Sequence, residues 1–111
     1  MSLGSIVSSR SPVAVSCAKR LVQNVANQYW PHVGTAAVPS FVAPIANGGV
    51  HLEWSGRDAE LELEVSEGAK LSYLWIDRRQ SPERTFHERH DVDQHEVIAT
   101  LGHVFGTAQD V

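Results

Sequence analysis

The first helical pattern lies near the N-terminus. Ser11-Pro12 joins a favoured N-cap residue to a proline at the first helical position, and apolar residues follow at three- and four-residue spacing. Proline cannot donate a backbone hydrogen bond inside a helix. We therefore expect an amphipathic helix that runs to about Gln28 and is ended by Pro31. Its apolar stripe is Val15, Ala18, Leu21, Val22, Val25 and Tyr29.

The next pattern has a period of two and predicts β-strands. Asn47-Gly48 is the preferred pair for a two-residue type I′ turn, and Gly56-Arg57 suits a second tight turn. Directly opposed residues share a face, so the two turns predict one apolar and one acidic face. Pro44 cannot donate to a sheet, which predicts that the first strand lies at an edge. The expected apolar face is Phe41, Ala43, Ile45, Val50, Leu52 and Trp54, and the other face is His51, Glu53, Glu60, Glu62 and Glu64.

The last third of the chain contains one strand pattern and one helix pattern. Residues 71–76 are apolar at successive positions, as in a strand covered on both faces, so the pattern leaves open which face Tyr73 and Trp75 occupy. Residues 77–91 are charged and predict an irregular loop. Asp93 and Glu96 match a capping box, and Gly106 is a suitable end for the second helix.

Together these elements predict an α+β fold with the order α-β-β-β-β-α. The expected architecture is a four-stranded antiparallel meander with two helices packed on one face. A chain of 111 residues favours one domain. We assign residues 11–106 to that domain, residues 1–10 to a flexible lead-in and residues 107–111 to a C-terminal tail.

Composition narrows the functional classes. The net charge of −4 argues against a non-specific nucleic-acid binder. The single cysteine, Cys17, excludes an internal disulfide and favours a reducing compartment. No apolar run approaches the roughly 20 residues of a membrane helix, and no signal peptide is recognisable. These features predict a cytoplasmic protein.

The first predicted turn also carries a distinctive motif. GGVHLEW occupies residues 48–54, after a proline-rich link and before an acidic-alternating strand over residues 61–65. Over roughly residues 21–75 the chain resembles a group of small bacterial proteins that share a GGVxLEW hairpin and have no assigned function. The resemblance implies a bacterial or phage source and a helix-plus-meander unit, and it carries no catalytic residue.

Three histidines form the candidate metal site. His87, His90 and His95 lie within nine residues, with carboxylates between them. Imidazole and carboxylate groups bind zinc and other divalent ions. The spacing differs from that of a metalloprotease helix, in which the histidines are four residues apart. The alternative is a hydrated loop that leads into the helix cap at Asp93.

The remaining candidates are surfaces for a partner. The glutamate face can dock a basic protein, or it can be an ordinary solvated face. Arginines suit phosphate contacts, but acidic residues are interleaved with Arg78, Arg79, Arg84 and Arg89, which favours local pairing over nucleic-acid binding. The candidate partner-binding residues are Glu53, Glu60, Glu62, Glu64, Tyr73, Trp75, Arg78 and Arg79.

Three functional hypotheses remain. We favour a small non-catalytic protein-binding module of accessory, antitoxin, immunity or inhibitor type, or a homodimer, because the sequence contains no catalytic motif. The first alternative is a metal-binding protein or metal-dependent enzyme that uses His87, His90 and His95. The second is a nucleic-acid-associated protein that uses the arginines between Arg78 and Arg89.

Overall fold

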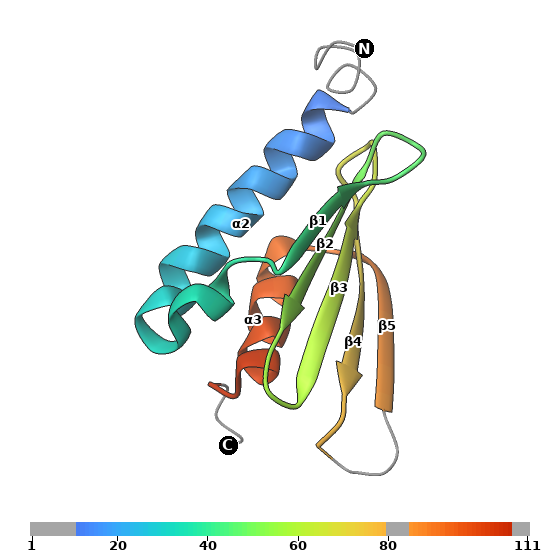
Figure 1. Ribbon diagram of the computed structural model, residues 1–111. Helices are drawn as coiled ribbons and strands as arrows, with labels where there is room; N and C mark the ends of the chain where they lie inside the picture. The colour runs from blue at the N-terminus through green and yellow to red at the C-terminus, as the bar shows by residue number, and fades with distance from the viewer. Residues whose placement is uncertain (1–10, 80–84, 108–111) are drawn as a thin grey trace.

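The computed structural model describes residues 11–79 and 85–107. Within these ranges the chain forms a five-stranded antiparallel sheet and two α-helices, which lie on the same side of the sheet (Figure 1). The predicted lead-in and residues 108–111 of the predicted tail lie outside the described residues. The elements are α2 (Pro12–Val33), the 3-10 helix η1 (Gly34–Ala37), β1 (Phe41–Pro44), β2 (Val50–Ser55), β3 (Ala59–Val65), β4 (Leu71–Asp77), β5 (Thr85–Val92) and α3 (Gln94–Phe105).

The sheet has one strand more than the sequence predicted. Thr85–Val92, expected as part of an irregular loop, forms β5 and pairs with β4. Its side chains are exposed except that of Val92, which is half-buried. A strand without a buried face needs no alternation of apolar and polar residues, so the pattern did not reveal it. The α+β class and the antiparallel meander are confirmed, and the count of four strands is wrong.

The first hairpin turns one residue earlier than predicted. Ala46 and Asn47 lie at the centre of the turn, because the N–H of Gly48 donates to the carbonyl oxygen of Ile45 at 3.1 Å. Gly48 has a φ of 87°, whereas Asn47 does not have a positive φ. A type I′ turn needs positive φ at both central residues, and the common three-residue loop needs it only at a final glycine. The chain therefore uses the three-residue loop.

This change of one residue in the register reverses the faces of β1. Phe41 lies opposite Glu53, and Pro44 lies opposite Val50 instead of His51. Phe41 and Ala43 therefore share the face of the glutamates, and their predicted place on the apolar face is wrong. The predicted edge position of β1 is confirmed.

The second hairpin keeps the predicted faces in a different register. Trp54 pairs with Leu61, two residues further along than predicted, and a shift of two residues leaves every side chain on its face. The turn is centred on residues 57–58. Gly56 serves another purpose, because a Cβ atom there would lie 1.9 Å from the carbonyl oxygen of Val104. This glycine lets α3 approach the sheet.

Helix α2 begins at the predicted cap and ends later than predicted. The side chain of Ser11 accepts a hydrogen bond from the N–H of Ala14. Pro31 lies inside the helix instead of ending it. At this position the proline removes only one hydrogen bond near the end of the helix. The helix closes where the N–H of Gly34 donates to the carbonyl oxygen of Trp30.

Helix α3 has both predicted ends. The Asp93 side chain accepts the N–H of Glu96 at 2.8 Å, and Gly106 closes the helix with a φ of 73°. Left-handed glycine is a frequent helix end because it lacks a Cβ atom. The carboxylate of Glu96 accepts a hydrogen bond from the Tyr73 hydroxyl at 2.9 Å. This bond links α3 to the sheet.

The core lies between the two helices and the inner face of the sheet. Trp54 is fully buried, and its indole N–H donates to the carbonyl oxygen of Ala37 at 3.1 Å. Tyr29 packs edge-on against Phe105 and joins the two helices. Burial raises the pKa of Tyr29. The other fully buried large side chains are Leu21, Val25, Leu52, Leu61, Leu63, Val65, Val97 and Leu101.

Candidate functional site

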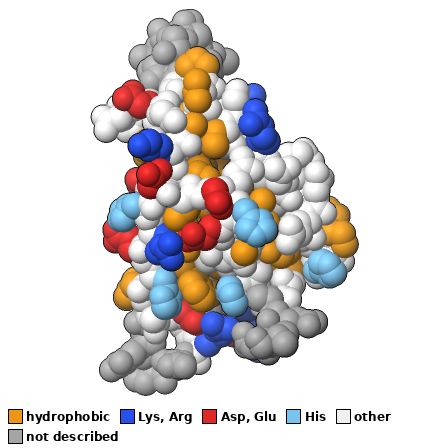
Figure 2. All heavy atoms as spheres, turned by 180° about the vertical axis from the view of Figure 1, so that it is seen from behind, with side chains coloured by type: hydrophobic (Ala, Val, Ile, Leu, Met, Phe, Trp, Pro, Cys, Tyr) orange, Lys and Arg blue, Asp and Glu red, His pale blue; other side chains and the backbone are white. Residues whose placement is uncertain are grey.

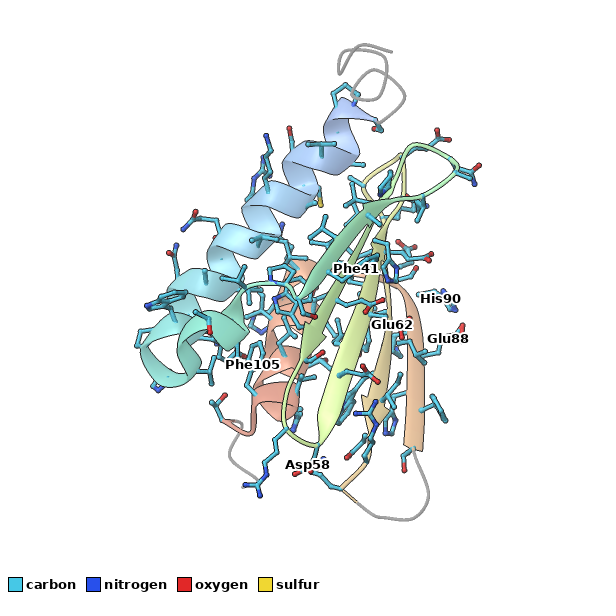
Figure 3. All side chains as sticks on the ribbon, in the orientation of Figure 1. Phe41, Asp58, Glu62, Glu88, His90 and Phe105 are labelled. Atoms are coloured by element: carbon cyan, nitrogen blue, oxygen red, sulfur yellow. The ribbon has the colours of Figure 1, made fainter. Side chains whose placement is uncertain are left out.

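The face of the sheet opposite the helices carries most of the candidate residues. Successive residues of a strand point to opposite faces, so the alternation that buries Leu52 and Leu63 turns their polar neighbours outward. We call this surface the open face. In Figure 3, Phe41, Glu62, Glu88 and His90 lie on the side of the sheet away from α2. The open face comprises Phe41, Ala43, His51, Glu53, Glu60, Glu62, Glu64, Ser72, Leu74, Ile76, Phe86, Glu88 and His90.

His51 is surrounded by carboxylates on this face. Its Nε2 atom lies 2.7 Å from a carboxylate oxygen of Glu53, and its Nδ1 atom lies 3.8 Å from one of Glu64. Glu62 lies directly opposite Glu53 on the neighbouring strand. The His51 side chain is only 17% exposed, and the ring of Phe41 meets it edge-on. The imidazole is therefore held in place from three sides.

A hollow of about 210 Å³ adjoins this group. Its far side is formed by Glu88 and His90 of β5, whose side chains pair at 2.8 Å. Two histidine–glutamate pairs therefore lie on either side of the hollow. The complete lining is His51, Glu62, Glu64, Ser72, Tyr73, Leu74, Glu88 and His90.

Apolar side chains also belong to the open face. Phe41 and Phe86 are 51% and 58% exposed, and they lie on the two edge strands. Ile76 is buried although it faces away from the helices, because Glu60 and Phe86 lie opposite it on the neighbouring strands. The open face thus combines carboxylates with aromatic side chains at both edges.

Tyr73 and Trp75 point to the inner face, which settles the alternative that the sequence left open. Tyr73 is 7% exposed, and its hydroxyl donates to Glu96 at 2.9 Å. Burial raises the pKa of Tyr73. Trp75 is partly buried and stacks between two imidazole rings. Its ring centroid lies 4.6 Å from that of His87 and 5.2 Å from that of His103. These two residues pack α3 and β5 against β4.

The structure separates the three histidines of the predicted metal site. His87 stacks on Trp75 at the inner face, His90 lies on the open face, and His95 lies in the first turn of α3. Among the described residues, the only group of three or more metal-ligand side chains with ligand atoms within 4.8 Å of one another is His51, Glu53 and Glu62. The sequence pattern did not point to this group as a metal site. Its signal was present in the i, i+2 spacing of His51 and Glu53 on one strand.

The arginines pair locally, as the interleaved charges predicted. Arg78 pairs with Glu60, and Arg79 pairs with Asp77 at 2.7 Å. Arg89 lies 3.5 Å from Glu96, and Arg84 lies outside the described residues. Figure 2 shows basic side chains scattered among acidic and histidine side chains on the face that it displays. Such pairing leaves these three guanidinium groups already engaged with carboxylates.

Asp77 and Arg79 form an ion pair at the end of β4. The Asp77 carboxylate accepts hydrogen bonds from the Arg79 side chain and from its backbone N–H. These bonds, the side-chain ones first, lower the pKa of Asp77 to about 2. The pair lies at the end of β4 beside the inner face, so it fixes a strand end instead of forming part of the open face.

No described helix has the length and apolar character needed to cross a membrane.

The chain was compared with protein-family models, curated proteins and solved structures. None of the three comparisons found a significant match.

Proposed function

We propose that the chain is a non-catalytic protein-binding module that docks a basic protein surface against its open face. The observation that carries the proposal is the imbalance of charge there. Five carboxylates share the face, whereas Arg78 reaches it through its pair with Glu60 and Lys70 adjoins it at a hollow shared with Glu64. The carboxylates are those of Glu53, Glu60, Glu62, Glu64 and Glu88.

The exposed aromatics supply the second requirement of an interface. Aromatic residues are enriched in the buried centres of protein interfaces, and Phe41 and Phe86 are each more than half exposed. Charge complementarity steers a partner toward a surface and selects its orientation. The combination fits a partner that presents lysine or arginine side chains beside an apolar patch.

The charge also argues that the partner is a different protein. Two copies docked through this face would bring like charges together, which costs free energy. A heterologous partner removes that repulsion. Accessory, antitoxin, immunity and inhibitor proteins all act by binding another protein, so the proposed class stays within these types.

The setting of the carboxylates supports a non-catalytic role. Acid–base catalysis by paired carboxylates requires environments that separate their pKa values. The carboxylates lie on a sheet surface that neither helix covers. Such a surface suits recognition better than chemistry.

Affinity capture tests the proposal. The tagged chain is used as bait in an extract of the source cells at about 50 mM and about 300 mM salt. We expect a basic protein to be retained at low salt and released at high salt. The double variant Glu62→Lys, Glu64→Lys should reduce the retained amount at least about tenfold, because it reverses two charges at the centre of the face.

A matched variant controls for net charge. Asp58→Lys, Glu67→Lys makes the same change in two turns, at exposed positions outside the open face, and should retain the partner. Phe41→Ser should weaken retention without changing its salt dependence. Equal retention by both double variants, or a purified chain that captures no protein, contradicts the proposal.

A further inference from the structure

The group formed by His51, Glu53 and Glu62 has the composition and geometry of a metal site. One ligand atom from each side chain lies within 4.8 Å of the other two. Zinc bound by nitrogen and oxygen lies about 2 Å from each ligand, so its ligands are about 3–4 Å apart. The three ligand atoms therefore already lie near this spacing.

The strands hold these residues at fixed positions. His51 and Glu53 project from β2 on the same face, and Glu62 lies directly opposite Glu53 on β3. Both strands lie in the interior of the sheet and are anchored by buried neighbours on the other face. A site built on rigid strands needs little ordering when the ion binds.

A second, independent feature is the group behind the imidazole. While Nε2 faces Glu53, Nδ1 faces a carboxylate oxygen of Glu64 at 3.8 Å. Metal-bound histidines commonly turn the other ring nitrogen toward a carboxylate, which fixes the tautomer and makes the ligand more basic. Phe41 covers the ring edge-on and limits its rotation.

The charges around the group lack a fixed cation. In the described part of the chain, no lysine or arginine nitrogen lies within 4 Å of the carboxylates of Glu53, Glu62 or Glu64. The nearest partner of two of them is His51, which is charged only when protonated. Directly opposed like charges on a sheet are unfavourable. A divalent ion would remove this repulsion.

We propose that His51, Glu53 and Glu62 bind one divalent transition-metal ion, with Zn²⁺ as the probe. An imidazole with two carboxylates favours such an ion over Mg²⁺ or Ca²⁺, which prefer sites made only of oxygen. The adjoining hollow of about 210 Å³ leaves room for water or another small ligand on the ion. This inference does not rest on the proposed docking function.

Titration of the isolated chain tests the site. Zn²⁺ is added to tag-free protein, stripped with chelator and carrying Cys17→Ser to remove thiol binding, and binding is followed by calorimetry. We expect one ion per chain and a rise in Tm, because an ion that binds the folded state stabilises it. His51→Ala and Glu62→Gln should each weaken Zn²⁺ binding at least tenfold. An excess of Mg²⁺ should not displace the ion.

The histidines outside the group supply the controls. His87→Ala, His90→Ala and His95→Ala should each bind Zn²⁺ as the parent does. Circular dichroism and the metal-free Tm show whether each variant folds. If His51→Ala does not fold, the isosteric double variant Glu53→Gln, Glu62→Gln still tests the site. Absence of stoichiometric binding by the parent overturns the proposal. So does binding that survives the His51 and Glu62 changes, or that is lost with His87 or His95 instead. Because no partner is present, neither result bears on the docking proposal.

Discussion

The two faces of the sheet are made from alternate residues of the same strands and are organised by different forces. On β2, Leu52 and Trp54 are at most 1% exposed beneath the helices, while the neighbouring Glu53 faces outward among other carboxylates. Burial of apolar surface stabilises the inner face by about 25 cal/mol per Å². On the open face, adjacent like charges work weakly against folding. The inner face therefore holds the fold together, and the open face contributes far less to stability.

The largest effect is expected when one aromatic side chain on each face is replaced by alanine. Trp54→Ala should lower the free energy of unfolding by about 3–5 kcal/mol, since it opens a cavity in the core and removes the hydrogen bond to Ala37. Phe41→Ala removes a side chain that is 51% exposed and should cost less than about 1 kcal/mol. Urea unfolding measures both values. Equal losses would mean that the open face contributes to stability as the core does.

The next test concerns how closely α3 approaches the sheet. Gly56→Ala should lower the free energy of unfolding by about 2 kcal/mol, because the added Cβ atom would meet the Val104 carbonyl oxygen at 1.9 Å. Gly68→Ala is the matched control, since its added Cβ atom meets only a serine hydroxyl at 3.9 Å. The control should change the free energy of unfolding by no more than about 0.5 kcal/mol in urea denaturation. A similar loss in both variants would contradict the close approach at Gly56.

The ion pair beside the inner face predicts a pH effect. The folded-state pKa of Asp77 is about 2, below its usual 3.8, so the folded chain binds this proton less readily than the unfolded chain. The stabilisation is therefore complete above about pH 5 and is lost as the pH falls toward 2. Asp77→Asn should cost about 1 kcal/mol at pH 7, with allowance for solvent screening of the exposed Arg79. The difference between variant and parent should shrink toward zero near pH 2.

Urea unfolding at pH 7 and at about pH 2.5 measures this difference. Glu88→Gln serves as the open-face control, because its pair with His90 is exposed on both sides. Exposed ion pairs contribute little to stability, so this control should change the free energy of unfolding by less than about 0.5 kcal/mol at pH 7. An Asp77→Asn variant with an unchanged pH profile would contradict the assigned role of Asp77.

The sequence predicted the elements that bury a face, and it predicted the exposed strand β1 through the turn that follows it, but it missed β5. The stripes of α2 and α3 and the alternation of β2 and β3 are periodic because one side of each is apolar. β5 has no buried side, so its residues follow no hydrophobic period. Hairpin register depends on which residue adopts positive φ. The contact of Gly56 with α3 is tertiary, so it leaves no sign in the local sequence.

The candidate site was predictable only in part, for the same reason. The glutamates were placed on their face correctly, since a register shift of two residues leaves the faces of β2 and β3 unchanged. Closeness along the chain suggested three histidines that the fold does not bring together, because His87 and His90 point to opposite faces of β5. His51 meets Glu62 and Glu64 only through pairing of β2 with β3, and that pairing requires the register of the structure.

The smallest predicted effect is an increase in the free energy of unfolding, whereas the variants above lower it. Glu62→Gln removes the charge that lies directly opposite Glu53 and keeps the shape of the side chain. In chelator, the change should raise the free energy of unfolding by about 0.5 kcal/mol, because it relieves repulsion between like charges across the strands.

Glu67→Gln removes the same charge from an exposed turn and should leave the free energy of unfolding unchanged. Added salt should reduce the gain of Glu62→Gln, since screening weakens the repulsion that the parent retains. Urea unfolding at about 50 mM and about 500 mM salt separates the two variants. A loss of stability in Glu62→Gln would mean that this carboxylate supports the fold. The contrast between an inner face that stabilises the fold and an open face whose charges oppose folding would then fail at its centre.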